Sequence, residues 1–291
     1  MNKLNDEKLI KNIMAQVFGE SRKVIAMERL GGLTNRSYAV FTVSDKYVVR
    51  LPGEGTEEII NRREESISTE LACRLGIDAK LYFFDAATGI KVSEYIENSR
   101  TMHQQDMQKK GNLILAAEVL KKLHNSGEDT KVPFDVIEMA EVYENYILKN
   151  GGSFYEDYAE VKELINKIRE SYLKRIIKKP CHNDPLCENW ILKKKKMYLV
   201  DWEYAGMNDP MWDLADVSIE AGLSREMDEV LLKAYLGKEP SRSDWKGFRA
   251  SKVLIDYLWS LWGKTMAIND NEMEQYALER YQRMKKNREL L

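Results

Sequence analysis

Two carboxylates and an amide occur at spacings that suit phosphoryl transfer. His182, Asp184 and Asn189 form the pattern H-x-D-x-x-x-x-N, and Asp201 follows at the end of an apolar strand. In kinase-like catalytic loops the first acid accepts the proton of the attacking hydroxyl, while the amide and the second acid hold magnesium. The alternative is that Asp184 and Asn189 only form a turn. Because Asp201 follows them on a returning strand, we predict Asp184 as the base and Asn189 and Asp201 as metal ligands.

A nucleotide needs a cradle, and residues 31–35 (GGLTN) offer one between two predicted strands. Glycines let backbone N–H groups approach phosphate closely, so we assign Gly31, Gly32, Thr34 and Asn35 to ATP binding. A pair of glycines also occurs in ordinary hairpins, and that interpretation stays open for this segment taken alone.

A cation on the third strand should contact the phosphates, and Arg50 is in that place. Kinases pair such a cation with an acid on the following helix. The helical pattern favours Glu65 for this role, with Glu64 as the alternative. We also assign Glu94 and Ile96, at the end of the last strand before a polar segment, to the ATP site.

An acceptor pocket is predicted from aromatic residues in the last third of the chain. Trp259 and Trp262 are three residues apart on a predicted helix, Tyr276 follows on the next helix, and Glu220 ends an earlier one. An aromatic stripe of this kind is often simply core. A quaternary ammonium, however, has no N–H to donate and is held best by aromatic faces with a carboxylate nearby.

The elements that must position these residues fall into two groups. Periodicity predicts a helix over 5–18, strands over 21–30, 37–43 and 46–51, a helix from 57 to 76, and strands over 81–84 and 89–96. We interpret residues 1–96 as a nucleotide-binding lobe.

A polar segment, 97–106, has no strand pattern and is a candidate hinge. Helices are predicted over 103–125, 135–149, 153–178, 211–222, 225–237, 241–268 and 271–288, and the only strand-like part between them contains Asp184 and Asp201. Ser241 and Asp244 form a predicted capping pair. Residues 97–291 are thus predicted as a mainly helical catalytic and acceptor-binding lobe. The fold class is α+β, a two-lobed protein-kinase-like fold.

Composition excludes several classes of protein. The net charge of −2 gives no overall attraction to nucleic acid, and no apolar run approaches the ~20 residues that span a bilayer. Three cysteines without paired spacing fit a reducing cytoplasm, and the N-terminal residues lack a signal-peptide pattern. We expect a cytoplasmic protein, monomeric or homodimeric, that binds a small molecule.

The sequence resembles the choline/ethanolamine kinases, and most closely the bacterial choline kinases of the aminoglycoside-phosphotransferase-like group. The resemblance rests on GGLTN (31–35), VRLPGEGTEEIINRREE (49–65), HNDPLCEN (182–189), DWEYAGMNDPMWDLA (201–215) and WSLWGK (259–264). It implies phosphorylation of choline to phosphocholine with ATP and Mg²⁺ as cofactors. By position, it also implies that Asp184, Glu220, Trp259, Trp262 and Tyr276 bind the substrate.

One departure concerns the catalytic loop. Bacterial relatives typically read DLVPEN, whereas this chain has Pro185 directly after Asp184. Proline removes an N–H and pushes the preceding residue toward extended angles, so either the loop is rerouted or the proline has moved within it. Two alternatives to choline phosphorylation stay open. One is the same fold acting on ethanolamine, thiamine or an aminoglycoside, and the other is a non-catalytic pseudokinase that binds choline or nucleotide.

Overall fold

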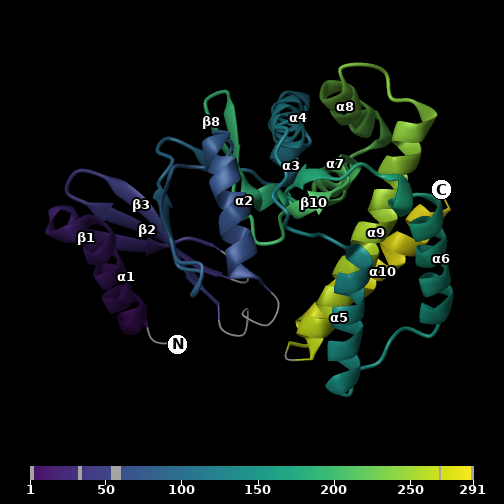
Figure 1. The fold of residues 1–291 in the computed structure, drawn as a ribbon, viewed down its shortest axis with the longest axis horizontal. Coiled ribbons are helices and arrows are strands. Elements are labelled where there is room, and N and C mark those ends of the chain that lie inside the picture. Colours follow the sequence, from purple (N-terminus) through teal and green to yellow (C-terminus); the bar gives the residue numbers. More distant parts are fainter. Residues whose placement is uncertain (1–2, 32–34, 54–59, 269, 290–291) are drawn as a thin grey trace. The chain divides into compact units, whose positions relative to one another are not determined.

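The computed structural model describes residues 3–31, 35–53, 60–268 and 270–289. The chain forms two compact units, coloured by sequence in Figure 1. Unit 1 comprises Met1–Met102 and Glu188–Ala205, and unit 2 comprises His103–Cys187 and Gly206–Leu291. The predicted division after residue 96 stays a prediction. It does not anticipate that the segment 188–205 packs with unit 1.

A five-stranded antiparallel sheet forms the centre of unit 1. Its spatial order is β1 (Val24–Arg29), β2 (Asn35–Thr42), β3 (Lys46–Pro52), β5 (Lys91–Glu94) and β4 (Leu81–Phe84). Helix α1 (Lys3–Phe18) covers one face, where its Ile10 and Met14 join Val49 and Leu51 of β3 in the core. Because side chains alternate along a strand, Arg50 lies on the opposite face, available to a second element.

That second element is helix α2 (Arg62–Arg74). Asn61 caps its N-terminus by accepting hydrogen bonds from the backbone N–H groups of Arg63 and Glu64. The predicted helix start at residue 57 lies outside the described residues. The cap fixes the first turn, and Glu65 in that turn is almost fully buried.

Unit 1 also contains a three-stranded sheet of β6 (Arg100–Thr101), β8 (Trp190–Lys193) and β9 (Lys196–Leu199). The prediction that residues 97–106 have no strand is wrong, because β6 pairs with β8. Two residues are too few for a periodic pattern, so this strand has no signal in the sequence. The β8–β9 hairpin separates Asn189 from Asp201.

Unit 2 is built around the long helix α9 (Arg242–Ala267), against which α5 (Val136–Lys149), α7 (Pro210–Ala221) and α10 (Glu272–Arg288) pack. The remaining elements are α3 (Gln104–Met107), α4 (Lys110–His124), α6 (Tyr158–Ser171), α8 (Arg225–Leu236), and the paired strands β7 (Lys179–Cys181) and β10 (Gly206–Asn208). Two predicted helices were too long. The first breaks between α3 and α4, and the second ends at Ser171, before a 3-10 turn at Leu173–Arg175.

The predicted cap of the long helix is confirmed. Ser241 accepts a hydrogen bond from the backbone N–H of Asp244, whose carboxylate accepts one from the backbone N–H of Ser241. Among the described residues, no helix has the length and apolar character that crossing a membrane requires.

Candidate active site

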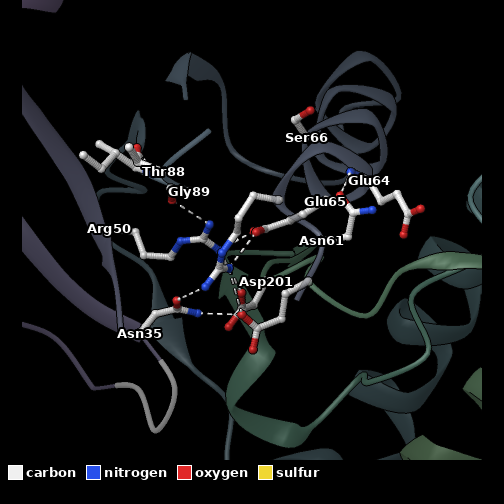
Figure 2. Close-up of polar contacts among 12 residues, drawn as sticks. Asn35, Arg50, Asn61, Glu64, Glu65, Ser66, Thr88, Gly89 and Asp201 are labelled. Carbon is white, nitrogen blue, oxygen red and sulfur yellow. Dashed lines mark hydrogen bonds and ion pairs between the residues drawn. The ribbon is translucent and has the colours of Figure 1, made fainter. Parts of the chain in front are cut away.

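A buried ion cluster lies on the α2 side of the unit 1 sheet (Figure 2). Arg50 donates from its Nη1 to Glu65, and the same nitrogen lies 3.3 Å from a carboxylate oxygen of Asp201. Its Nη2 donates to the carbonyl of Gly89 at 3.0 Å. Glu65, and not Glu64, is therefore the acid that pairs with Arg50. Strand β3, helix α2 and the residue just after β9 thus meet at one guanidinium group.

Three further residues complete the cluster. Arg62 bridges Glu65 at 2.8 Å and Glu203 at 3.4 Å. The side-chain amide of Asn35 donates to Glu203 at 2.8 Å, and its oxygen accepts from Arg62 at 3.3 Å. The predicted ATP ligand Asn35 is thus bound to neighbouring side chains within unit 1.

The electrostatics of the cluster favour an additional cation. Burial and the negative charge of Asp201 raise the pKa of Glu203 to about 7, above the usual value for a carboxyl. Burial acts to lower the pKa of Arg50, but the charge of Glu65 outweighs it and the pKa is raised. Three carboxylates face two guanidinium groups here, and Asp201 is the most exposed of the three, with 34% of its side chain accessible. Carboxylate oxygens at a partly open, negatively charged position fit a hard divalent cation.

Asn189 and Asp201 are brought together by the β8–β9 hairpin. The backbone N–H of Val200 donates to the carbonyl of Asn189 at 3.0 Å, one residue before Asp201. Asp201 has φ +71°, a left-handed backbone conformation that is rare outside glycine, asparagine and aspartate. The predicted proximity of these two residues is therefore present in unit 1. Their role as metal ligands stays a prediction.

The other predicted nucleotide ligands are less defined. Gly31 is exposed, and a Cβ atom added at its position would meet no atom of the described residues within 4 Å. Gly32 and Thr34 lie outside the described residues. Glu94 is exposed at the end of β5, and its backbone N–H donates to the carbonyl of Lys80 at 2.8 Å. Ile96 is buried. Their assignments to ATP binding stay predictions.

In unit 2, a buried carboxylate holds the backbone that leads into the predicted base. Asp213 of α7 accepts hydrogen bonds from the backbone N–H groups of His182 and Asn183, both at 2.8 Å. Its Oδ2 also lies 2.9 Å from Nε2 of His124, whose Nδ1 is 2.9 Å from the hydroxyl of Tyr235. These side chains come from α7, α4 and α8, so three helices fix the loop that carries Asp184.

Asp184 itself is half-buried on this loop, just after Asn183, which has φ +67°. The backbone N–H of Asp184 donates to Nδ1 of His182 at 3.3 Å, and its carbonyl accepts from Leu186 at 2.8 Å. Pro185, whose missing N–H drew attention in the sequence, is buried within this turn. The turn closes across the proline through Leu186.

The predicted aromatic residues of the acceptor site come together in unit 2. The ring centroids of Trp259 and Trp262 are 6.3 Å apart, and those of Trp262 and Tyr276 are 5.7 Å apart, both edge-to-face. Gly263 makes this possible, because a side chain there would come within 2.8 Å of the Tyr276 ring. The close approach of α9 and α10 at this glycine sets the aromatic group.

Glu220 is tied to a residue that the sequence did not single out. Its carboxylate lies 2.6 Å from Nη1 of Arg280, and the Arg280 guanidinium lies 4.9 Å from the ring centre of Tyr276. Burial raises the pKa of Tyr276, and among the nearby acids Glu220 and Asp184 raise it further. The predicted base and the predicted acceptor residues are therefore within electrostatic reach of one another in unit 2.

Several residues of these clusters were missed from the sequence. Glu203 and Asp213 lie in the block 201–215, which was quoted for the family resemblance. Helical spacing was a second usable signal, because Asp213, Asp216 and Glu220 lie at positions i, i+3 and i+7 and so share one helical face. The sequence contains no comparable signal for His124 and Arg280, because their partners are distant along the chain.

Comparisons with known proteins agree with this arrangement. The sequence pattern of the choline/ethanolamine kinase family matches residues 27–248. Protein LicA of Haemophilus influenzae is 31% identical over 264 residues, which cover 88% of this chain and 78% of LicA. The choline kinase LicA of Streptococcus pneumoniae is 32% identical with a TM-score of 0.84, over 97% of this chain and 98% of that structure. A structure of LicA with AMP is also 32% identical, with a TM-score of 0.81 over 96% of each chain.

These similarities cover nearly the whole chain, and the predicted α+β, protein-kinase-like fold class is confirmed. The matched region includes the Arg50–Glu65 pair, the Asp184 loop and the Asp201 hairpin. The chain therefore belongs to the choline/ethanolamine kinase family and is a phosphotransferase that acts on an alcohol group.

Proposed function

We propose that this protein transfers the γ-phosphoryl group of ATP to the hydroxyl of choline, with Mg²⁺ bound, and forms phosphocholine. The observation that carries the proposal is the edge-to-face group of Trp259, Trp262 and Tyr276 with Glu220 close by, and the charge of Asp184 also acts on Tyr276. A candidate base thus lies near an aromatic and acidic group. The relatives named as choline kinases support the same acceptor.

The chemistry of the acceptor cluster fits a quaternary ammonium. Such a cation cannot donate a hydrogen bond, so it is stabilised mainly by aromatic faces and by net negative charge. The face of Tyr276 already lies within 4.9 Å of the Arg280 guanidinium, which supports the ability of this ring to accept a cation. The neighbouring indoles of Trp259 and Trp262 would supply two further apolar walls.

Asp184 would act as the general base. A carboxylate within hydrogen-bond reach of the acceptor hydroxyl removes its proton as the oxygen attacks phosphorus, and this assistance typically contributes ~10²–10⁴-fold to the rate. Asp213 supports this role, because it fixes the two backbone N–H groups directly before Asp184. The backbone that leads into the base is therefore held by buried hydrogen bonds.

Unit 1 would bind the nucleotide and the metal. Arg50, positioned by Glu65, would contact the phosphates, and Asp201 with Asn189 would hold Mg²⁺. When bound, Mg²⁺ neutralises charge that develops on the phosphate oxygens. The surplus of carboxylates at Asp201 and Glu203 supports this assignment, since a divalent cation would relieve the repulsion that raises the pKa of Glu203.

An acceptor panel tests the proposal. Purified protein with Mg-ATP is offered choline, ethanolamine, thiamine and an aminoglycoside, and ADP formation is followed by a coupled assay. We expect choline to have the highest kcat/KM. Preferred turnover of another acceptor would overturn the substrate assignment but keep the phosphotransferase. Absence of turnover with all four, combined with thermal stabilisation by choline or nucleotide, would instead indicate a non-catalytic binding protein.

A further inference from the structure

One buried carboxyl group in the acceptor cluster makes no hydrogen bond to any residue that the structure describes. Asp216 of α7 is 0% exposed, and within the described part of the chain neither of its carboxylate oxygens has a hydrogen-bond partner. Buried carboxyl groups are normally paired, so one without a partner requires a functional explanation. Its neighbours on the same helix, Asp213 and Glu220, both have defined partners.

Helical spacing directs Asp216 toward the acceptor cluster. Asp213, Asp216 and Glu220 lie at positions i, i+3 and i+7, and therefore share one face of α7. The groups that act on Asp216 are Asp213 and Glu220 from α7, Asp184 from the catalytic loop and Arg280 from α10. The charge of Asp216 in turn acts on Tyr276.

The two guanidinium groups of this cluster are paired with carboxylates other than Asp216. Arg283 binds Asp256 through two contacts of 2.8 and 2.6 Å, and Arg280 pairs with Glu220 at 2.6 Å. Two guanidinium groups thus match two carboxylates, and Asp216 remains as a third. Ionised, Asp216 would add a negative charge that neither Arg280 nor Arg283 pairs with, close to Asp184, and a bound monovalent cation would offset it.

We propose that Asp216, and not Glu220 alone, supplies the charge that holds a cationic acceptor, because Glu220 is already paired with Arg280. This inference rests on the proposed function, since it concerns the acceptor of that reaction. Asp216 would act as a specificity residue: it would favour a cationic alcohol over a neutral alcohol of the same shape.

The protonation of Asp216 fits this role. Burial, followed by the charges of Glu220 and Asp184, raises its pKa well above the usual range. A raised pKa favours the neutral form of the carboxyl group when no ligand is present, which explains how it is tolerated in the interior. A bound cation would favour the ionised form, so binding would release a proton.

The test compares choline with 3,3-dimethyl-1-butanol, in which carbon replaces the charged nitrogen. For the variant Asp216→Asn, we expect the KM for choline to rise about 10- to 100-fold through loss of one nearby charge. The inhibition constant of the neutral analogue and the KM for Mg-ATP should stay within about twofold of wild type. Asp228→Asn is the matched control: Asp228 is also buried, but it is paired with Lys252 at 2.8 Å, and its loss should leave the choline preference unchanged.

Equal weakening of choline and the neutral analogue in Asp216→Asn would overturn the inference, because it would indicate a packing role. An unchanged KM for choline would overturn it as well. A second measurement needs no variant: calorimetry of choline binding to wild type in two buffers of different ionisation enthalpy. Proton release with choline but not with the analogue supports the inference, and no release with choline contradicts it.

Failure of the proposed function can be distinguished from failure of the role inferred for Asp216. If the wild type forms no phosphocholine, the proposed function fails, and the binding affinities for choline and the analogue still decide on Asp216. Weaker choline binding in Asp216→Asn, with unchanged analogue binding, supports its role in a cation site. Failure of the wild type to bind choline overturns both.

Discussion

Arg50 and Glu65 form an ion pair whose side chains are only 4% and 0% exposed. Removing one partner of such a buried pair leaves the other charge uncompensated, which typically costs about 3–5 kcal/mol. We predict that Glu65→Gln lowers the free energy of unfolding by an amount near the lower end of this range, because Asp201 remains near Arg50 and Glu203 remains near Arg62. It should also raise the KM for the nucleotide more than the KM for choline. Urea unfolding and steady-state kinetics measure the two effects.

Glu64→Gln is the matched control for this prediction. Figure 2 shows Glu64 on the same turn of α2 but directed away from Arg50. We expect its unfolding free energy and kinetics to stay near those of wild type. If the two variants behaved alike, the pair would have no role in stability or nucleotide binding.

We predict that Asp213 supports catalysis by holding the backbone of the catalytic loop in place. Asp213→Asn weakens the acceptor of two backbone N–H groups and removes the charge beside His124, so we expect a loss of about 2 kcal/mol of stability. The kcat should fall about 10- to 100-fold with little change in the KM for choline, because a misplaced base slows the chemical step. The kinetics of Asp228→Asn provide the comparison. A kcat equal to that of wild type would contradict this positioning role.

Asp78 makes stability depend on pH. Its burial raises the pKa of the carboxyl to about 6, although the positive charge of Lys91 acts in the opposite direction. A carboxyl group whose pKa is higher in the folded state than in the unfolded state favours folding when it is protonated. Ionisation of this group at higher pH therefore lowers the free energy of unfolding. Stability is therefore lost as the pH rises from about 4 to about 6, by about 3 kcal/mol in total. We predict that Asp78→Asn gains stability relative to wild type across this range, measured by urea unfolding at several pH values.

Asp85→Asn gives the opposite sign and serves as the control. The carboxylate of Asp85 accepts hydrogen bonds from the Thr88 hydroxyl and the Ala87 backbone N–H, which lower its pKa. Its contribution to stability is present above the unfolded pKa and is lost as the pH falls. A stability difference between wild type and Asp78→Asn that does not change with pH would refute the assignment.

Much of the fold could be predicted because strand patterns and helix caps depend on residues that are close together in the sequence. Alternation located β2, short apolar runs located β3 and β4, and the Ser241–Asp244 cap marked the start of α9. The two-residue strand β6 was missed because its pairing partner, β8, is about ninety residues away in sequence. The same limit applies to the site: motif spacing predicted roles for Asp184 and Asp201, whereas spacing carries no information on charge pairing across helices.

Arg280 illustrates that limit. The sequence indicated that Glu220 and Tyr276 could hold a cation, but it could not show that an internal guanidinium already contacts both. That contact depends on the close packing of α10 on α9 at Gly263. The identity of the unpaired acid, Asp216, follows only once these pairs are known.

We propose that Asp184 activates the hydroxyl of choline for attack on the γ-phosphate. The most direct test is ³¹P NMR of a reaction containing choline, Mg-ATP and either the wild type or Asp184→Asn. We predict that the wild type produces phosphocholine and ADP in equal amounts, and that the variant is slower by about 10²- to 10⁴-fold while it remains folded and binds choline. Phosphocholine formation by the variant at the wild-type rate would contradict the assignment of Asp184, and ADP without phosphocholine in the wild-type reaction would contradict the choline kinase activity itself.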